Sequence, residues 1–440
     1  MSIKLLVRFS SLLSVLSILL LQGCATSAQK TAYMRNLVAS SQYDLALVEA
    51  EKALLKDSSG VMENMNVGLL RRLAKDYAGS NRAFEKAKQK IDALYTSSIT
   101  EYTTASLTND ENISFRGDRF EQVLVHLYMA SNYLQLEELD SARVELLQSQ
   151  TKMNEWGEPK DEIPFMRYFS GILFEMMGEE DSAAVSYRKA VDAYKNTYVK
   201  HGLRVPVQLK YDLLRVLANM RLWDELERYK KQLGLNDYKI DRRRNQSELV
   251  VILGNGMVPQ REQRVFHTWS PELKYNIRVA VPDYIYPPAY VNSARVRIAD
   301  QSYMMQTVSN VDGLARAALS ENMHIITARA IARAVIKKKT EIKVGENSGS
   351  LGQMTAMIAN FSSEIADTRG WNTLPQQFEL ARIDLPAGDY NVAIELLNSA
   401  GYIVDVIYED ITVKSGDIKI INKHWTSPVV RSDPIVKNNS

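Results

Sequence analysis

Residues 171–190 read GILFEMMGEEDSAAVSYRKA. Small and aromatic side chains recur through this stretch: Gly171, Phe174, Gly178, Ala183, Tyr187 and Ala190. Small residues allow two paired helices to approach closely, and aromatic rings fill the space between successive pairs. Such a pair has an apolar face that it cannot bury alone, so the stretch predicts further helix pairs stacked beside it.

The same pattern recurs upstream and downstream. Tyr43 and Tyr77 lie 34 residues apart and begin similar segments, and Gly68 precedes Tyr77. A third unit has Ala130, Tyr133 and Ala142, and a fifth, degenerate unit runs from Val207 to Leu233 with Trp223 at its turn. A period of 34 residues with these positions resembles the tetratricopeptide repeat. The resemblance implies an all-α solenoid over residues 36–235, and a generic helical bundle is the alternative.

In tetratricopeptide proteins the first helix of each pair lines a concave groove. Alignment to the repeat predicts these groove residues: Met62, Met65, Leu69, Arg72, Leu124, Leu127, Leu134, Phe165, Tyr168 and Ile172. An apolar concave surface of this size is not left bare in water. A segment of a partner protein or the chain's own second half could fill it, and the sequence leaves both open.

The N-terminus predicts export. Lys4 and Arg8 precede an apolar run of 13 residues, Phe9–Leu21, which is shorter than the roughly 20 residues of a transmembrane helix. This is the layout of a secretory signal. Cys24, the single cysteine of the 440 residues, follows Leu21-Gln22-Gly23. That string resembles the signal of bacterial lipoproteins, although an ordinary signal peptide with an incidental cysteine is the alternative.

The lipoprotein resemblance implies that residues 1–23 are removed and that Cys24 is acylated. Residues 24–35 would then form a lipidated tether. Ala25, rather than Asp, follows the cysteine, which favours the outer membrane by the sorting rule of enteric bacteria. We therefore expect a lipid-anchored protein on the periplasmic face of the outer membrane, held by several acyl chains.

The second half, residues 246–440, predicts an α+β region. Strands are expected over 248–308, where LVVIL (249–253) is a compact β-prone run. A helical hairpin packed on a sheet is expected over 312–366, with a linker at 345–352; a helix on the membrane surface is the alternative. A small β-sandwich is expected over 376–422.

The sequence predicts no catalytic set, metal or cofactor. Its five histidines are dispersed, and Glu321 and His324 form one Glu-x-x-His, whereas a di-metal bundle needs two and further carboxylates. Three Ser-x-x-Lys strings lack the other motifs of their enzyme class. The net charge of +2 becomes zero once residues 1–23 are removed, which argues against a nucleic-acid partner.

Two strings, FRGDRFE (115–121) and ADTRGWNTLP (366–375), resemble those of a family of Gram-negative lipoproteins with tetratricopeptide-like helices and a C-terminal α+β region. That family is associated with lipoproteins that activate peptidoglycan synthases. The resemblance implies a non-enzymatic scaffold in cell-envelope assembly, with a protein partner held in the groove, in the setting of the peptidoglycan synthesis machinery. The alternatives are an envelope enzyme acting on peptidoglycan or polysaccharide, and a glycan-binding or export accessory module.

Overall fold

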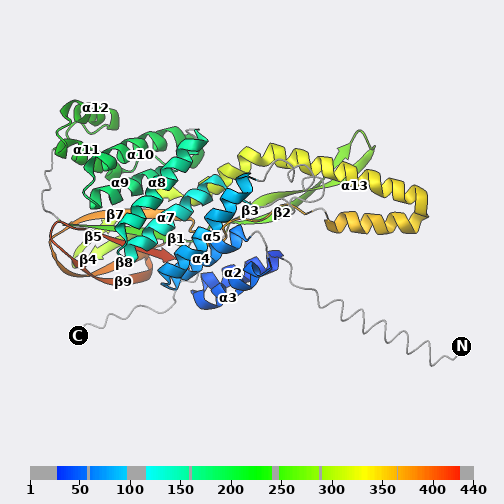
Figure 1. Ribbon diagram of the computed structural model, residues 1–440, viewed down its shortest axis with the longest axis horizontal. Coiled ribbons are helices and arrows are strands. Elements are labelled where there is room, and N and C mark those ends of the chain that lie inside the picture. The colour runs from blue at the N-terminus through cyan, green and yellow to red at the C-terminus, as the bar shows by residue number, and fades with distance from the viewer. Residues whose placement is uncertain are drawn as a thin grey trace, which may run out of the picture.

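The computed structural model describes residues 27–56, 60–96, 115–157, 161–239, 247–286, 290–363 and 365–426. Within these ranges the chain forms a helical N-terminal half, a β-sandwich, and an arm that projects away from both (Figure 1). Cys24, the predicted signal peptide and residues 97–114, between the second and third repeats, lie outside them.

Consecutive helices of the N-terminal half pack in pairs. The pairs are α2 (Ser27–Ala39) with α3 (Tyr43–Leu54), α4 (Val61–Leu73) with α5 (Tyr77–Thr96), α7 (Arg119–Gln135) with α8 (Leu139–Trp156), α9 (Pro164–Met176) with α10 (Glu180–His201), and α11 (Val207–Asn219) with α12 (Trp223–Leu233). The degenerate fifth unit predicted at 207–233 corresponds to α11 and α12. The first helix, α2, corrects the expectation of a tether at 24–35, because Met34 and Leu37 pack with Ala46 and Ala50 of α3.

The turns inside these five pairs share one geometry. Two residues before each second helix, the backbone is left-handed: Ser41, Lys75, Glu137, Gly178 and Arg221 have φ of 57°, 65°, 60°, 76° and 59°. In each turn the next residue donates its N–H to a carbonyl five residues back, as Glu179 does to Phe174 at 2.8 Å. This is the Schellman arrangement that ends a helix. Its recurrence shows that the five pairs are copies of one structural unit.

The predicted small residues lie where paired helices touch. A Cβ built on Gly171 of α9 would be 2.3 Å from the ring of Tyr187 on α10, and one on Gly68 of α4 would be 2.5 Å from the ring of Phe84 on α5. Real Cβ atoms do not approach another atom that closely. Glycine at these positions is therefore required by the aromatic ring that faces it.

Replacing Gly171 with Ala is expected to destabilise the protein by about 1–3 kcal/mol, because the added methyl group overpacks the contact. Tyr187 cannot easily move away, since it is fully buried and donates a hydrogen bond to Glu175 at 2.8 Å. Elsewhere in a helix interior the same change stabilises by roughly 0.5–1 kcal/mol. The sign of the shift in a urea-unfolding midpoint checks the prediction, and a more stable variant would contradict it.

The sandwich contains two four-stranded sheets. The inner sheet, in spatial order, is β10 (Ile418–Trp425), β1 (Ser247–Asn255), β7 (Gln377–Leu385) and β6 (Gln306–Asn310). The outer sheet is β5 (Gln301–Met304), β4 (Ser293–Ile298), β8 (Gly388–Leu397) and β9 (Ile403–Val413). β1 runs parallel to β10 and antiparallel to β7. Leu249 and Val251 point into the core between the sheets, whereas Val250 and Ile252 point toward the helices.

This topology corrects the predicted division of the second half. Four strands of the 248–308 stretch, β1, β4, β5 and β6, form one sandwich with the strands expected at 376–422, because β1 pairs with both β7 and β10 and β4 pairs with β8. The long helix between them is an insertion between β6 and β7. β1 lies in the middle of the inner sheet and needs a neighbouring strand on each side. Both neighbours, β7 and β10, follow the inserted helix in the sequence.

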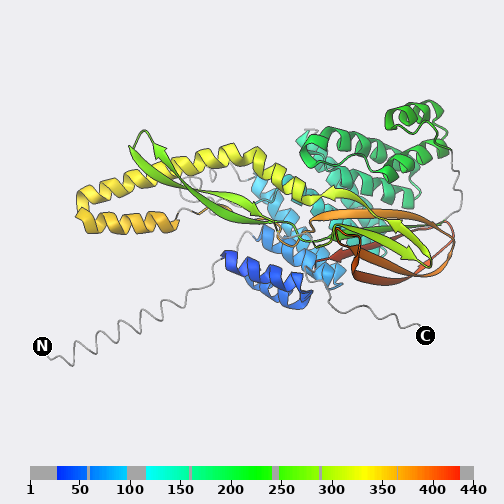
Figure 2. The ribbon, with the colours of Figure 1, turned by 180° about the vertical axis from the view of Figure 1, so that it is seen from behind.

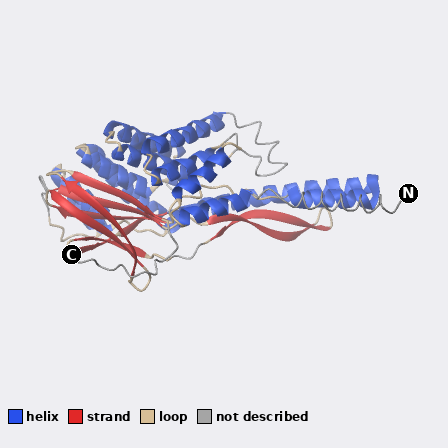
Figure 3. Ribbon diagram, turned by 90° about the horizontal axis from the view of Figure 1, so that it is seen from below, coloured by secondary structure: helices blue, strands red, loops and turns tan. Residues whose placement is uncertain are grey.

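The arm consists of that helix, α13 (Val311–Ser363), and the two-stranded ribbon β2 (Gln260–Ser270) and β3 (Tyr275–Ile285). The ribbon lies alongside α13 (Figures 2 and 3), and the far end of α13 turns back (Figure 2). Ile277, Val279 and Val281 of β3 pack on Ala330 and Ala334. This agrees with the expected packing on a sheet, but the linker expected at 345–352 is helical. Across the described residues, no helix combines the length and apolar character needed to span a membrane.

Candidate functional site

The predicted groove residues all lie on the first helices α4, α7 and α9, and the chain buries them. Met65, Leu69, Leu124, Leu127, Phe165, Tyr168 and Ile172 are each at most 1% exposed, and Arg72 is 7% exposed. Met62 and Leu134 are partly buried against the same core. A groove open to a partner would leave these side chains exposed.

The inner sheet and the segment before β7 fill the groove. The ring centroids of Phe165 and Phe378 lie 5.2 Å apart. Trp371 lies 5.5 Å from Phe84 and 5.6 Å from Tyr128, ring centre to ring centre. The inner sheet covers this part of the repeats as a layer (Figure 1). The expectation that a partner segment occupies these positions is therefore wrong, because the chain's own second half occupies them.

A buried ionic cluster joins the helices to the inner sheet at the same interface. Arg382 of β7 is 1% exposed and contacts three carboxylates: Glu175 at 3.0 Å, Asp212 at 3.3 Å, and Glu248. Arg215 of α11 pairs with Glu175 and Asp212. Burial alone would raise the pKa of Glu175, but the two arginines outweigh burial and lower that pKa to about 2. These ion pairs join α9 and α11 of the repeats to β1 and β7 of the inner sheet.

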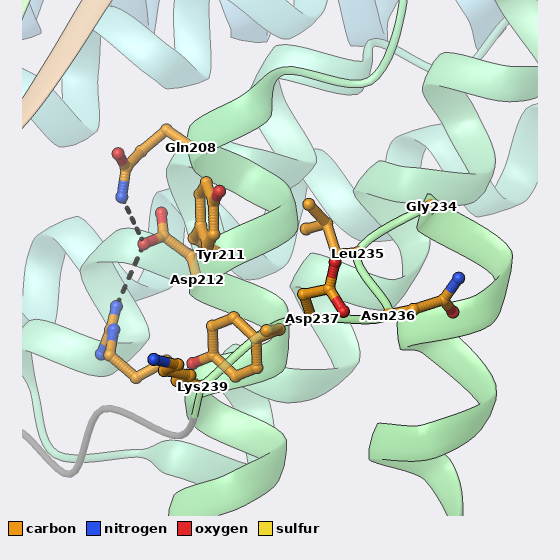
Figure 4. A pocket seen from close by; sticks show the side chains of 10 residues that line it. Gln208, Tyr211, Asp212, Gly234, Leu235, Asn236, Asp237 and Lys239 are labelled. Carbon is orange, nitrogen blue, oxygen red and sulfur yellow. Dashed lines mark hydrogen bonds and ion pairs between the residues drawn. The ribbon is translucent and has the colours of Figure 1, made fainter.

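A pocket of about 500 Å³ borders this cluster, between α11 and the segment that follows α12 (Figure 4). Asp212 accepts hydrogen bonds there from Gln208 at 3.0 Å and from Arg215 at 3.2 Å. Tyr211 packs against Tyr238 of the segment that follows α12, with ring centres 6.0 Å apart. The chain itself therefore occupies part of this stretch of the concave surface.

The two strings that carry the family resemblance meet at the base of the arm. Glu121 accepts hydrogen bonds from the backbone N–H of Trp371 and of Asp118, both at 2.7 Å, and with Asp118 forms a capping box on α7. Arg261 of β2 pairs with Asp118 and donates to the carbonyl of Arg369 at 3.0 Å. Burial and the nearby Asp118 raise the pKa of Glu121 to about 7, although Arg261 opposes them.

An open cleft of about 690 Å³ lies beside this junction, between the body and the arm. Its walls carry charges of both signs and apolar side chains, among them Arg119, Asp161, Lys200, Glu321, Leu314, Ile325 and Arg329. Lys200 and Glu321 pair across it at 2.9 Å, and Ile325 is 41% exposed. The sequence singled out the FRGDRFE string but could not place α13 opposite it.

Ionisable side chains on the cleft wall and inside the repeats form ion pairs with one another. Glu321 of the predicted Glu-x-x-His motif pairs with Lys200. Within the described ranges, no three His, Cys, Asp or Glu side chains are placed to hold a metal ion. His126 is buried on α7, where its Nδ1 lies 2.6 Å from Glu145, and Glu145 also binds Lys88 at 3.0 Å. That trio ties α5, α7 and α8 together.

No protein-family model matches this sequence, and no curated protein matches it. Solved structures do match. MamA is 13% identical over 46% of this chain and 92% of its own, with a TM-score of 0.30. The apo form of RapI is 14% identical over 52% of this chain and 60% of its own, with a TM-score of 0.35. YrrB, a TPR protein with an unusual peptide-binding site, is 13% identical over 48% of this chain and 90% of its own, with a TM-score of 0.28. The five shared turns, rather than these scores, establish the repeat character of the helical half.

Proposed function

We propose that this protein is a non-enzymatic scaffold of cell-envelope assembly, anchored to the outer membrane through acylated Cys24 and facing the periplasm. The lipoprotein-like signal supports the anchor. The repeats supply a rigid body, and the inner sheet closes their groove. A protein partner is therefore expected to bind elsewhere than at the predicted groove residues.

The observation that carries the proposal is the open cleft between arm and body. Its volume of about 690 Å³ is comparable to that of small-molecule pockets, roughly 300–1,000 Å³, so several side chains of a partner could enter it. Its mixture of exposed apolar and charged side chains suits a short protein segment better than a small uncharged ligand. Both strings of the family resemblance lie at or beside it.

Site-directed photocrosslinking in cells tests this function. A photoreactive residue at position 325, on the cleft wall, is expected to yield a discrete adduct with an envelope protein. The same residue at position 415 is the control, since Ser415 is exposed in the turn between β9 and β10. That turn lies beside the start of β1, whereas the chain enters the arm after the end of β1. Glu321→Lys reverses one charge of the cleft and is expected to abolish the adduct. Equal adducts at both positions, or an adduct unchanged in E321K, would contradict the proposal.

A further inference from the structure

The tip of the ribbon carries a cluster of basic and aromatic side chains that the scaffold function does not use. The basic-aromatic patch consists of Trp269, Lys274, Tyr275, Lys338 and Lys339. Lys338 lies over the ring of Tyr275, 5.1 Å from its centre, and Lys339 pairs with Glu272 of the turn. These contacts bring the lysine run of α13 against the ribbon turn.

Its aromatic members are exposed. Trp269 is 56% exposed and Tyr275 is 51% exposed. The ribbon buries other apolar side chains, Ile277 and Val279, against α13. The two aromatic rings are therefore exposed although the same ribbon has a buried apolar face. Trp and Tyr left at a surface beside lysines are the combination found where proteins meet the interfacial region of a bilayer.

The patch also concentrates positive charge. Segments 264–278 and 333–343 contain eight Lys and Arg residues and two Glu residues, a net charge of +6, whereas the whole chain carries +2. The rest of the chain is therefore net negative. An anionic lipid surface attracts such a basic segment, and the attraction falls off within a Debye length.

The first helix begins on the same side of the body as the arm that carries the patch. α2 begins at Ser27, on the side of the body from which the arm extends (Figures 1 and 2). Two residues lie between Cys24 and Ser27, so the chain spans at most about 10 Å from one to the other. An acyl anchor at Cys24 would hold that side of the body at the bilayer.

We infer that the basic-aromatic patch binds the anionic surface of the membrane that carries the anchor. For the direction of the arm, the inference rests on the proposed anchor at Cys24. Two attachment points fix an orientation that one acylated residue cannot. The body would then be held at a set angle, with the cleft at a set height above the lipid.

Quenching of Trp269 fluorescence by brominated lipids tests the inference on the full acylated chain. The difference in emission between the wild type and Trp269→Phe isolates this indole from the other four tryptophans. In vesicles containing brominated phosphatidylglycerol we expect that emission to fall by at least half. Zwitterionic vesicles, or 0.5 M salt, should restore it, because salt at that concentration screens the attraction.

Lys338→Gln with Lys339→Gln should reduce the quenching to the zwitterionic level. The matched control is Lys414→Gln with Lys419→Gln, two exposed lysines of the sandwich, which should leave it unchanged. Circular dichroism of each variant reports folding.

Flotation of the protein with lipid vesicles distinguishes binding through the acyl anchor from binding through the basic-aromatic patch. Protein that floats with zwitterionic vesicles, and loses this property in Cys24→Ser, carries the anchor. If such protein floats with anionic vesicles while Trp269 stays unquenched, the inference fails and the anchor stands. If the anchor is absent and Trp269 is still quenched by anionic vesicles, the patch stands alone. A shift of Trp269 emission with soluble heparin but not with vesicles would assign the patch to an anionic polymer and overturn the inference.

Discussion

Leu127→Asp is expected to unfold the protein rather than to empty a binding groove. Leu127 is 1% exposed on α7, inside the core shared by the repeats and the inner sheet. Substitution there removes apolar contacts and buries a carboxylate that has no partner, at a cost of at least about 3–5 kcal/mol. That is a large part of the roughly 5–15 kcal/mol that stabilises a typical protein. Urea unfolding followed by circular dichroism measures the loss.

Leu147→Asp is the matched control, because Leu147 lies on the second helix of the same pair and is 40% exposed. We expect its unfolding free energy to stay within about 0.5 kcal/mol of the wild type. An open groove would give the opposite pattern, with Leu127→Asp folded normally and defective only in partner capture. Equal midpoints for the two variants would therefore show that the sheet does not cover α7.

The repeat architecture could be predicted because its contacts are local. Gly171 meets Tyr187 only 16 residues away, and the two positions recur at the period of the repeat. The occupant of the groove could not be found in this way. Phe165 meets Phe378, and Trp371 meets Phe84, across more than 200 residues. No local pattern specifies such pairs.

One signal in the sequence did favour a filled groove. LVVIL at 249–253 is apolar on both faces, and a strand of this kind is covered by a layer on each side. In the structure the outer sheet covers one face and the repeats cover the other. A central strand with two apolar faces needs a layer on each face. The apolar groove predicted for the repeats was a surface that could supply the second layer.

The arm was less accessible to sequence reasoning. The helical recurrence from Leu314 to Lys339 predicts α13, but its glycines at 345, 349 and 352 indicated a linker where the structure has helix. β2 is exposed along most of its length and carries no regular alternation of apolar and polar residues, so its sequence gave only a weak strand signal. The cleft depends on how this arm leaves the body, which no single segment encodes.

Arg382→Met is expected to cost about 3–5 kcal/mol, because it removes the cation that neutralises three buried carboxylates and leaves Arg215 to serve two of them. Arg295→Met is the control. Arg295 pairs with Glu395 at 2.6 Å but is one-third exposed, and Arg297 remains beside the same carboxylate. A partly exposed pair of this kind contributes up to about 1 kcal/mol, so the control should unfold close to the wild type.

The stability of the Arg382→Met variant at low pH provides a second test. Glu175 has a pKa of about 2 in the folded protein against an ordinary value of 4.5, so its contribution is complete above pH 4.5 and disappears as the pH falls toward 2. Without Arg382 the pKa of Glu175 rises, and that loss begins at higher pH. The acid-unfolding midpoint of Arg382→Met should therefore move upward relative to that of Arg295→Met. Identical acid midpoints would mean that Arg215 alone keeps the pKa of Glu175 low. The ionic contact between the repeats and the sandwich would then not depend on Arg382 of β7.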